Sequence, residues 1–229
     1  MHTHLETAST TVRRQPITEP AQQQAILHGI SWETYERLLA DLADRSAPRL
    51  TFDQGVLEVM SPTAEHEEYN RTLALFVEVV AEEMRINVRG LGSTTFKRQD
   101  LLKGFEPDSC FYIQSAQRIR GKKRLDLSQD PPPDLVIEID LTSLSLDRFP
   151  IFAQVGVPEV WRYDGSRFQI FKLVDEQYEE VAQSVALPKL TSAVVTQFLE
   201  DSLELERIEW LHRLREWVRK TAEENEADG

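Results

Sequence analysis

EPDSCFYI, residues 106 to 113, places an aspartate directly after a proline at the start of a run with the composition of a β-strand. A second stretch, PPPDLVIEID at residues 131 to 140, also begins with prolines and continues as an apolar strand that carries three acids. Acidic residues are depleted in strands, and burying a carboxylate without a partner costs free energy. Carboxylates on two core-like strands are therefore the feature on which the interpretation of this chain depends.

The acids of the second stretch share one face of the predicted strand, because successive strand side chains point to opposite faces. Asp134, Glu138 and Asp140 lie on the same side as Val136, and the opposite side is entirely aliphatic. Asp134 and Glu138 are about 13 Å apart along the strand, too far to share an ion, whereas Glu138 and Asp140 are about 7 Å apart. Opposite residues on neighbouring strands approach to about 5 Å, so Asp108 is the expected partner of Glu138.

Two carboxylates at this distance repel each other, and a divalent cation bound between them removes the repulsion. Ligands that are all oxygen atoms favour Mg²⁺ or Mn²⁺ over Zn²⁺. We therefore expect Asp108 and Glu138 to bind Mg²⁺, with Mn²⁺ as a substitute and Asp140 as a candidate third acid. The alternative is that these acids face water and protect an edge strand. For Asp134, at the mouth of its strand, this alternative or a turn-capping role is favoured.

The composition is that of an ordinary globular protein with one core of good size. The 229 residues are 41% hydrophobic and 28% charged. The longest apolar run, LALFVEVVA at residues 73 to 81, is interrupted by Glu78, so no membrane span is expected. The first residues contain no apolar signal segment, and the single cysteine, Cys110, excludes an internal disulfide. We expect a cytoplasmic protein in which Cys110 is a small core residue.

The charge is unevenly distributed. A net charge of −13 disfavours a general affinity for nucleic acid, which depends on lysine and arginine. The segment RIRGKKR, residues 118 to 124, nevertheless contains five cations and no acid. It lies on the connection between the two acidic strands, so it is a candidate contact for a nucleic-acid backbone through Arg118, Arg120, Lys122, Lys123 and Arg124. The alternative is an ordinary solvated loop.

Periodicity and turn residues predict mixed helices and strands in one domain. Residues 1 to 25 are expected to be a mobile leader, residues 26 to 200 the folded domain, and residues 201 to 229 a C-terminal amphipathic helix. A helix is expected after Ser31, a hairpin around residues 53 to 55, and a long helix over residues 64 to 84. One strand or a bent pair should follow between residues 86 and 98.

The second half is expected to contain the acidic strands, a short helix around RFPIFAQV and a three-stranded meander. Asp147 would be the N-cap of the short helix and Gly156 its left-handed stop. The end of the chain should be helical, with one apolar stripe: Leu203, Ile208, Leu211, Leu214 and Val218. Either the core or a second copy of the chain is expected to cover this stripe. A homodimer is the expected assembly.

The run from EPD through PDLVIEID to GVPEVWRYD resembles the bacterial restriction-endonuclease-like domains of the PD-(D/E)XK nuclease superfamily. The resemblance covers roughly residues 30 to 190, and PDSCFYI, PDLVIEI, GVPEVWRY and ALPKL occur in the family's order. It implies an α/β (mixed α+β) class, with a restriction-endonuclease-like core of mixed sheet flanked by helices and a C-terminal helical extension. It also implies that Asp108 and Glu138 bind magnesium near a scissile phosphodiester, with the carbonyl of Ile139 as a further ligand.

The chain departs from the superfamily pattern at the basic residue. The E-x-K motif would place lysine at position 140, where this chain has Asp140, and the lysine of this branch corresponds to Arg148. Arginine keeps the charge but cannot act as a base, although it can stabilise a pentavalent phosphate or orient a water. Glu67, with His66 beside it, matches the acid that the family often carries on the preceding helix. The alternative for Glu67 is an exposed first turn, where acids suit the helix dipole.

The resulting hypothesis is a magnesium-dependent phosphodiesterase, an endonuclease that acts on nucleic acid, with DNA favoured. Asp108 and Glu138 would hold the metal, and Arg148 and Glu67 would complete the catalytic set. One alternative is a degenerate descendant that binds nucleic acid or protein without cleaving. Another is an interaction module whose C-terminal stripe carries the function.

Overall fold

A computed structural model of the chain describes residues 23–43, 45, 47–141 and 146–227. Most of the leader predicted for residues 1 to 25 lies outside the described residues. Its last three residues do not belong to a leader, because they begin strand β1 (Gln23–His28). This strand has no alternation of polar and apolar residues and is largely exposed at a sheet edge, so periodicity could not reveal it.

The first sheet has five strands in the order β1-β3-β2-β6-β5, and all its neighbours are antiparallel. The predicted hairpin is confirmed as β2 (Arg49–Asp53) and β3 (Val56–Ser61), joined at Gln54 and Gly55, which both have positive φ. The predicted bent segment contains β4 (Arg89–Gly90) and β5 (Phe96–Arg98). Strand β6 (Lys103–Phe105) follows a short 3₁₀ turn (Gln99–Leu101) and was too short to predict.

Helix α1 (Trp32–Asp41) covers this sheet and is capped by Ser31, as predicted. The aromatic rings of Trp32, Tyr35 and Phe52 pack together between the helix and the sheet. Tyr35 requires a glycine on β6, since a Cβ atom at Gly104 would lie 2.2 Å from the Tyr35 hydroxyl oxygen.

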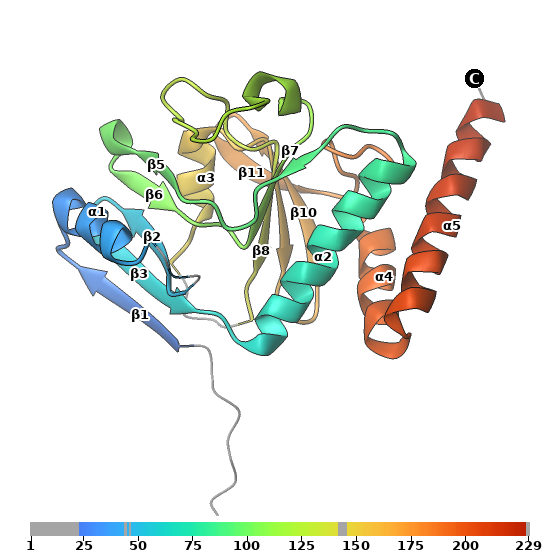
Figure 1. Cartoon of the computed structure of the whole chain (residues 1–229), viewed down its shortest axis with the longest axis horizontal. Helices are drawn as coiled ribbons and strands as arrows, with labels where there is room; N and C mark the ends of the chain where they lie inside the picture. The colour runs from blue at the N-terminus through green and yellow to red at the C-terminus, as the bar shows by residue number, and fades with distance from the viewer. Residues whose placement is uncertain (1–22, 44, 46, 142–145, 228–229) are drawn as a thin grey trace, which may run out of the picture.

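The second sheet is mixed and has six strands in the order β11-β10-β9-β8-β7-β4. Its strands after β4 are β7 (Ser109–Tyr112), β8 (Leu135–Ile139), β9 (Glu159–Tyr163), β10 (Phe168–Val174) and β11 (Gln177–Val181). Only β8 and β9 pair in parallel, and β9 to β11 form the predicted meander. The mixed α+β class is confirmed, with two sheets in place of one (Figure 1).

Helices cover both faces of the second sheet. Helix α2 (Ala64–Glu83) packs with α4 (Ser192–Glu204) and α5 (Arg207–Ala227) over one face, which includes Leu135, Ile137 and Ile139. Helix α3 (Phe149–Val155) connects β8 to β9 and covers the other face, with Val136 and Cys110. The predicted segregation of strand faces is therefore confirmed. Cys110 is a core residue, and burial raises the pKa of its thiol to about 12.

The short helix differs from the prediction at its start. Its N-cap is Arg148, one residue later than predicted, although Asp147 Oδ1 still accepts a hydrogen bond from the Phe149 amide at 3.1 Å. Gly156 ends the helix in the left-handed region, as predicted. The side chain of Arg148 forms no capping hydrogen bond and belongs to the site described below.

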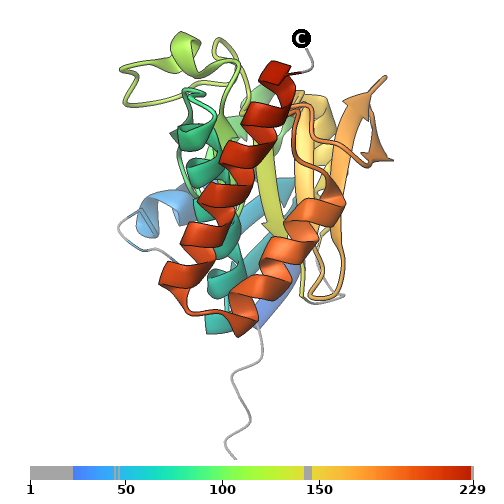
Figure 2. The ribbon, with the colours of Figure 1, turned by 90° about the vertical axis from the view of Figure 1, so that its right-hand side faces the viewer.

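The C-terminal extension is two helices, and the prediction of a single helix from residue 201 was wrong. Helix α4 ends when Leu205 adopts an extended conformation, and Trp210 Nε1 of α5 donates to the Phe198 carbonyl of α4 at 2.7 Å. Figure 2 shows α5 in front of α2 and α4 beside it, in front of the strands of the second sheet. Leu214 and Val218 are buried and Leu211 is half-buried, but Leu203 and Ile208 are 59% and 72% exposed. The chain itself therefore covers most of the stripe.

The far end of α2 is attached to α5 by ion pairs. Glu83 accepts from Arg215 at 2.5 Å and from Arg219 at 2.8 Å, and Arg215 also reaches Glu82. Among the helices in the described ranges, none is both long enough and apolar enough to cross a membrane.

Candidate active site

Asp108 is held at the start of β7, where the two predicted metal strands meet. Ser109 pairs with Ile137, and the same antiparallel register places Asp108 opposite Glu138. The Asp108 carboxylate is 1% exposed, and its Oδ2 accepts a hydrogen bond from the Ile139 amide at 2.7 Å. Asn70 of α2 donates to the backbone carbonyl of Asp108 at 3.1 Å. Asp108 is thus fixed by its own strand, by β8 and by α2.

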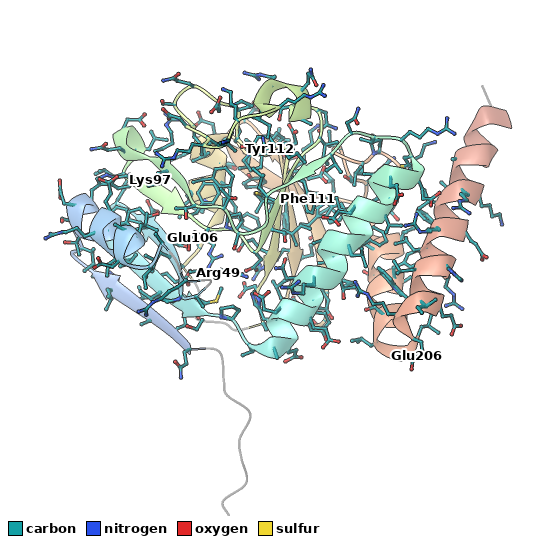
Figure 3. All side chains as sticks on the ribbon, in the orientation of Figure 1. Arg49, Lys97, Glu106, Phe111, Tyr112 and Glu206 are labelled. Carbon is teal, nitrogen blue, oxygen red and sulfur yellow. The ribbon has the colours of Figure 1, made fainter. Side chains whose placement is uncertain are left out.

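Arg49, the first residue of β2, neutralises Asp108 from the other sheet. Its guanidinium contacts the carboxylates of both Asp108 and Glu67, and the side chain is 6% exposed. Burial lowers the pKa of Arg49, and the nearby carboxylates of Glu67 and Glu138 act in the opposite direction. Figure 3 shows Arg49 between the β2–β3 hairpin and helix α2. This arginine therefore links the acid on α2 to the acid on β7.

Glu138 is paired with Arg148, which also contacts a third acid, Glu58. Arg148 Nη1 lies 2.5 Å from Glu138 Oε2, and its Nη2 lies 2.7 Å from Oε2 of the fully buried Glu58. Glu58 Oε1 accepts from the Leu146 amide at 3.0 Å. Burial raises the pKa of Glu138, and Arg148 counteracts part of that increase. Burial alone would lower the pKa of Arg148, but Glu138 and Glu58 outweigh it and raise that pKa.

The cluster carries more negative than positive charge. Four carboxylates (Glu58, Glu67, Asp108 and Glu138) surround two guanidiniums (Arg49 and Arg148), which leaves two negative charges if every acid is ionised. One acceptor, Glu138 Oε1, is buried without a hydrogen-bond partner among the described residues. A buried carboxylate oxygen in that state is stable only if the group takes up a proton or meets a further cation.

His66 is the neutral member of the cluster. Its side chain is fully buried, and its Nε2 lies 3.2 Å from Asp108 Oδ2. Burial lowers the pKa of His66 to about 4, with smaller contributions from Arg49 and Arg148, while the backbone of Ile139 acts in the opposite direction. His66 is therefore uncharged near neutral pH, and it does not add to the positive charge around Asp108.

The lowered pKa of His66 predicts a pH-dependent loss of stability. Between pH 6.5 and 4 the unfolded chain binds a proton on this imidazole that the folded protein excludes, so the folded state loses stability as pH falls. A change from 6.5 to about 4 corresponds to an upper limit on the order of 3.5 kcal/mol. Urea unfolding of wild type and His66→Gln in EDTA between pH 7 and 4.5 should show a weaker decline for the variant.

The raised pKa of Glu138 has the opposite sign, because its contribution is lost as pH rises through the folded-state pKa. It is present in both proteins and cancels in their difference. Parallel pH profiles for wild type and His66→Gln would contradict the assignment of a low pKa to His66.

The other predicted residues lie at or beside this cluster. Glu67 is not merely a solvated acid of the first helical turn, because it is ion-paired to Arg49. Asp140 pairs with Arg162 of β9 at 2.5 Å. Asp134 Oδ2 accepts from the amides of Ile113 and Ser115 at 2.6 and 2.9 Å. The turn-capping role favoured for Asp134 is therefore confirmed.

The basic segment between β7 and β8 does not form a single surface. It includes a short 3₁₀ helix (Ala116–Ile119), and Lys122 is paired with Asp130. Arg118, Arg120 and Lys123 are exposed. Arg124 lines a cleft that also reaches Arg49. Their contact with nucleic acid stays a prediction.

Sequence reasoning missed Arg49, Glu58 and Asn70. Glu58 had a detectable signal, since it is an acid inside the apolar strand VLEVM, the same pattern that singled out Glu138. Arg49 and Thr51 share the polar side of their strand, and the apolar Leu50 and Phe52 lie on the other side. This pattern is typical of a solvent-facing cation. Asn70 lies on α2, where the helical spacing predicts which apolar residues face the core but assigns no role to a polar residue. No local pattern connects the last two residues to Asp108.

A comparison with protein-family models matches residues 32–206 to Uma2, described as "Putative restriction endonuclease". The chain belongs to the Uma2 family. The match includes Arg49, Glu58, Asp108, Glu138 and Arg148, so the whole charged cluster lies inside the family region. It ends at the junction between α4 and α5, and α5 is therefore an addition to the matched region.

A solved structure supports the fold assignment for this member of the Uma2 family. It is a protein from Anabaena variabilis ATCC 29413, described as a putative nuclease belonging to DUF820, determined at 1.96 Å resolution. The two chains are 14% identical and superpose with a TM-score of 0.52, over 80% of this chain and 99% of the other. A search of curated proteins finds no match. At this level of identity the similarity establishes a common fold.

Proposed function

We propose that this protein is a metal-dependent endonuclease that hydrolyses phosphodiester bonds in nucleic acid, with DNA as the substrate. The observation that carries the proposal is the buried pair Asp108 and Glu138, opposite each other on β7 and β8 in a cluster with an excess of negative charge. Membership of a family described by restriction endonuclease activity supports the same reaction.

The cluster fits Mg²⁺ or Mn²⁺ in its donor chemistry. Its candidate ligands are oxygen atoms: the two carboxylates and, as the family resemblance implies, the carbonyl of Ile139. Within the described residues, no group of three or more histidine, cysteine or acidic side chains could hold a metal by itself. Mg²⁺ commonly binds one or two carboxylates and keeps water and substrate phosphate as its other ligands. The unpartnered Glu138 Oε1 is an acceptor that such an ion would satisfy.

The bound ion would supply a water of lowered pKa and electrostatic stabilisation of the phosphate. Asp108 and Glu138 would hold that ion, and Asn70 and the Ile139 amide would keep Asp108 in position. Arg49 occupies one oxygen of Asp108, so its guanidinium would shift toward Glu67 when the site is loaded. Arg148 would donate to the phosphate, where a guanidinium can stabilise developing negative charge.

Arg148 cannot accept the proton of the attacking water, because its pKa is raised above that of an ordinary arginine. Glu67 is neutralised by Arg49, and Asp140 is paired with Arg162. The proton would therefore pass to bulk hydroxide or to one of these acids after its ion pair opens. Slow cleavage that accelerates with pH follows from this arrangement.

Cleavage assays with and without metal test the proposal. Supercoiled plasmid and labelled oligonucleotides should be cut with Mn²⁺ or Mg²⁺ but not with EDTA, and faster with Mn²⁺. If hydroxide removes the proton, the rate should rise about tenfold per pH unit between pH 7 and 9. No metal-dependent cleavage over this range would refute the nuclease and favour the alternative, a family member that binds without cutting.

The homodimer stays a prediction, as does the cytoplasmic location. A two-fold pair would suit cleavage of both strands of a duplex, since each copy would supply one site. Leu203 and Ile208 are the exposed apolar residues at the α4–α5 corner that such a contact would cover.

A further inference from the structure

A cleft of about 670 Å³ opens on Arg49 from the side of helix α1. It lies between the end of α1, the start of β2, the loop before β5 and the basic segment that contains Arg124. Figure 3 shows Lys97, Glu106 and Arg49 in succession from the β5–β6 hairpin toward the centre of the molecule. Because Arg49 also contacts Asp108, this side chain belongs both to the wall of the cleft and to the candidate active site.

The lining of the cleft is more basic than the protein as a whole. Arg45, Arg49, Lys97 and Arg124 line it, with two acids, Glu36 and Glu106, in a chain whose net charge is −13. Lys97 is paired with Glu36 at 3.0 Å. Arg45 and Arg124 are exposed and form no ion pair within the part of the chain that the structure describes. These two guanidiniums are therefore available to an anionic ligand.

Glu106, one of the two acids in the lining, is already engaged. Glu106 accepts from the Leu50 amide at 2.8 Å and from the Thr95 hydroxyl at 2.5 Å. Its negative charge also acts on Arg49, where it offsets a small part of the lowering of the pKa that burial causes. Glu106 thus connects β2 to the loop before β5 in the wall of the cleft.

The shape and lining of the cleft define what it can hold. No aromatic ring is among the described residues that line it, so bases have no stacking surface there. The Ser93 hydroxyl lies along one wall, whereas the hydroxyls of Thr94 and Thr95 already donate to the Leu91 carbonyl and to Glu106. A cleft of this volume holds a ligand of the size of a small molecule, too small for a duplex. These features suit phosphates of one strand and give no means of reading its bases.

We propose that this cleft binds the phosphate backbone of a single strand of the nucleic-acid substrate, with Arg45 and Arg124 as its contacts and Arg49 at its inner end. The inference rests on the proposed function for the identity of the ligand. It adds the path by which a strand reaches Asp108 and Glu138.

Equilibrium binding of a fluorescein-labelled single-stranded oligonucleotide in EDTA tests the cleft without any cleavage. The double variant R45Q/R124Q should bind at least ~10-fold more weakly than wild type. The slope of log K against log salt concentration should become less steep by about 1.4, which is 0.7 for each of the two lost phosphate contacts. Oligo-dA and oligo-dT should bind within about threefold of each other, because backbone contacts carry no sequence information.

The matched control is R37Q/R85Q, which removes the same charge from exposed arginines outside the cleft. It should bind within about twofold of wild type, and thermal unfolding should show that both variants are folded. Equal weakening in the two variants, unchanged binding by R45Q/R124Q, or no binding by wild type would overturn the cleft proposal. Wild type that binds through the cleft but never cleaves would instead refute the nuclease and leave the binding site standing.

Discussion

Replacing Arg148 with methionine should lower the free energy of unfolding by about 3–5 kcal/mol, because it leaves buried carboxylates without their cation. Arg148 contacts both Glu58 and Glu138, and Glu58 is fully buried. Urea denaturation at pH 7 measures the change. The matched control is Arg167→Met, which removes an exposed pair with Glu180 and should cost at most about 1 kcal/mol.

Removing the two acids as well should restore much of the lost stability. In the triple variant Glu58→Gln, Glu138→Gln, Arg148→Met, the cation and the charges it neutralises disappear together, so the penalty for an unpaired buried charge is relieved. A single Arg148→Met variant as stable as the Arg167→Met control would contradict the buried pairing described for Arg148.

Asp108→Asn and Glu138→Gln should each reduce metal-dependent cleavage by at least ~100-fold, since each removes a charge that would hold the ion. Mn²⁺ binding, followed by electron paramagnetic resonance, should weaken in parallel. This second readout separates loss of the ion from loss of a later step.

Asp134→Asn is the matched control for these variants. Asp134 receives a comparable substitution at the mouth of β8, but its carboxylate caps the turn at residues 113 to 115. Within the described residues its side chain accepts hydrogen bonds from Ile113 and Ser115, and none from Arg49 or Arg148. It should keep its cleavage rate below its unfolding temperature. Full activity in Asp108→Asn or Glu138→Gln would exclude the two-carboxylate site.

The sequence was informative where a residue type conflicts with its local structure. Asp108 and Glu138 stood out because acids are unfavourable in core strands, and strand alternation correctly assigned Glu138 to the side of Val136. Strongly periodic elements were also predicted, as the agreement over α1, α2 and the β9–β11 meander shows.

The ion pairs could not be predicted, because they join residues far apart in the sequence. Arg49 and Asp108 are separated by 59 positions, and Arg148 and Glu58 by 90. Each pairing depends on how the two sheets are placed against each other, and no local periodicity encodes that arrangement. Strands β1 and β6 were missed for a different reason: one is exposed without alternation, and the other has three residues.

The charged cluster has a consequence for how the domain unfolds. Arg49 and Glu58 belong to the five-stranded sheet, whereas Asp108 and Glu138 belong to the six-stranded sheet and its entrance. Opening the seam between the sheets would break Arg49 from Asp108 and Glu58 from Arg148 at once, within surroundings where unpaired charges are costly. Unfolding one sheet while the other stays folded is therefore unfavourable in free energy. The charged cluster, which contains the residues proposed for catalysis, therefore favours cooperative unfolding of the two halves of the domain.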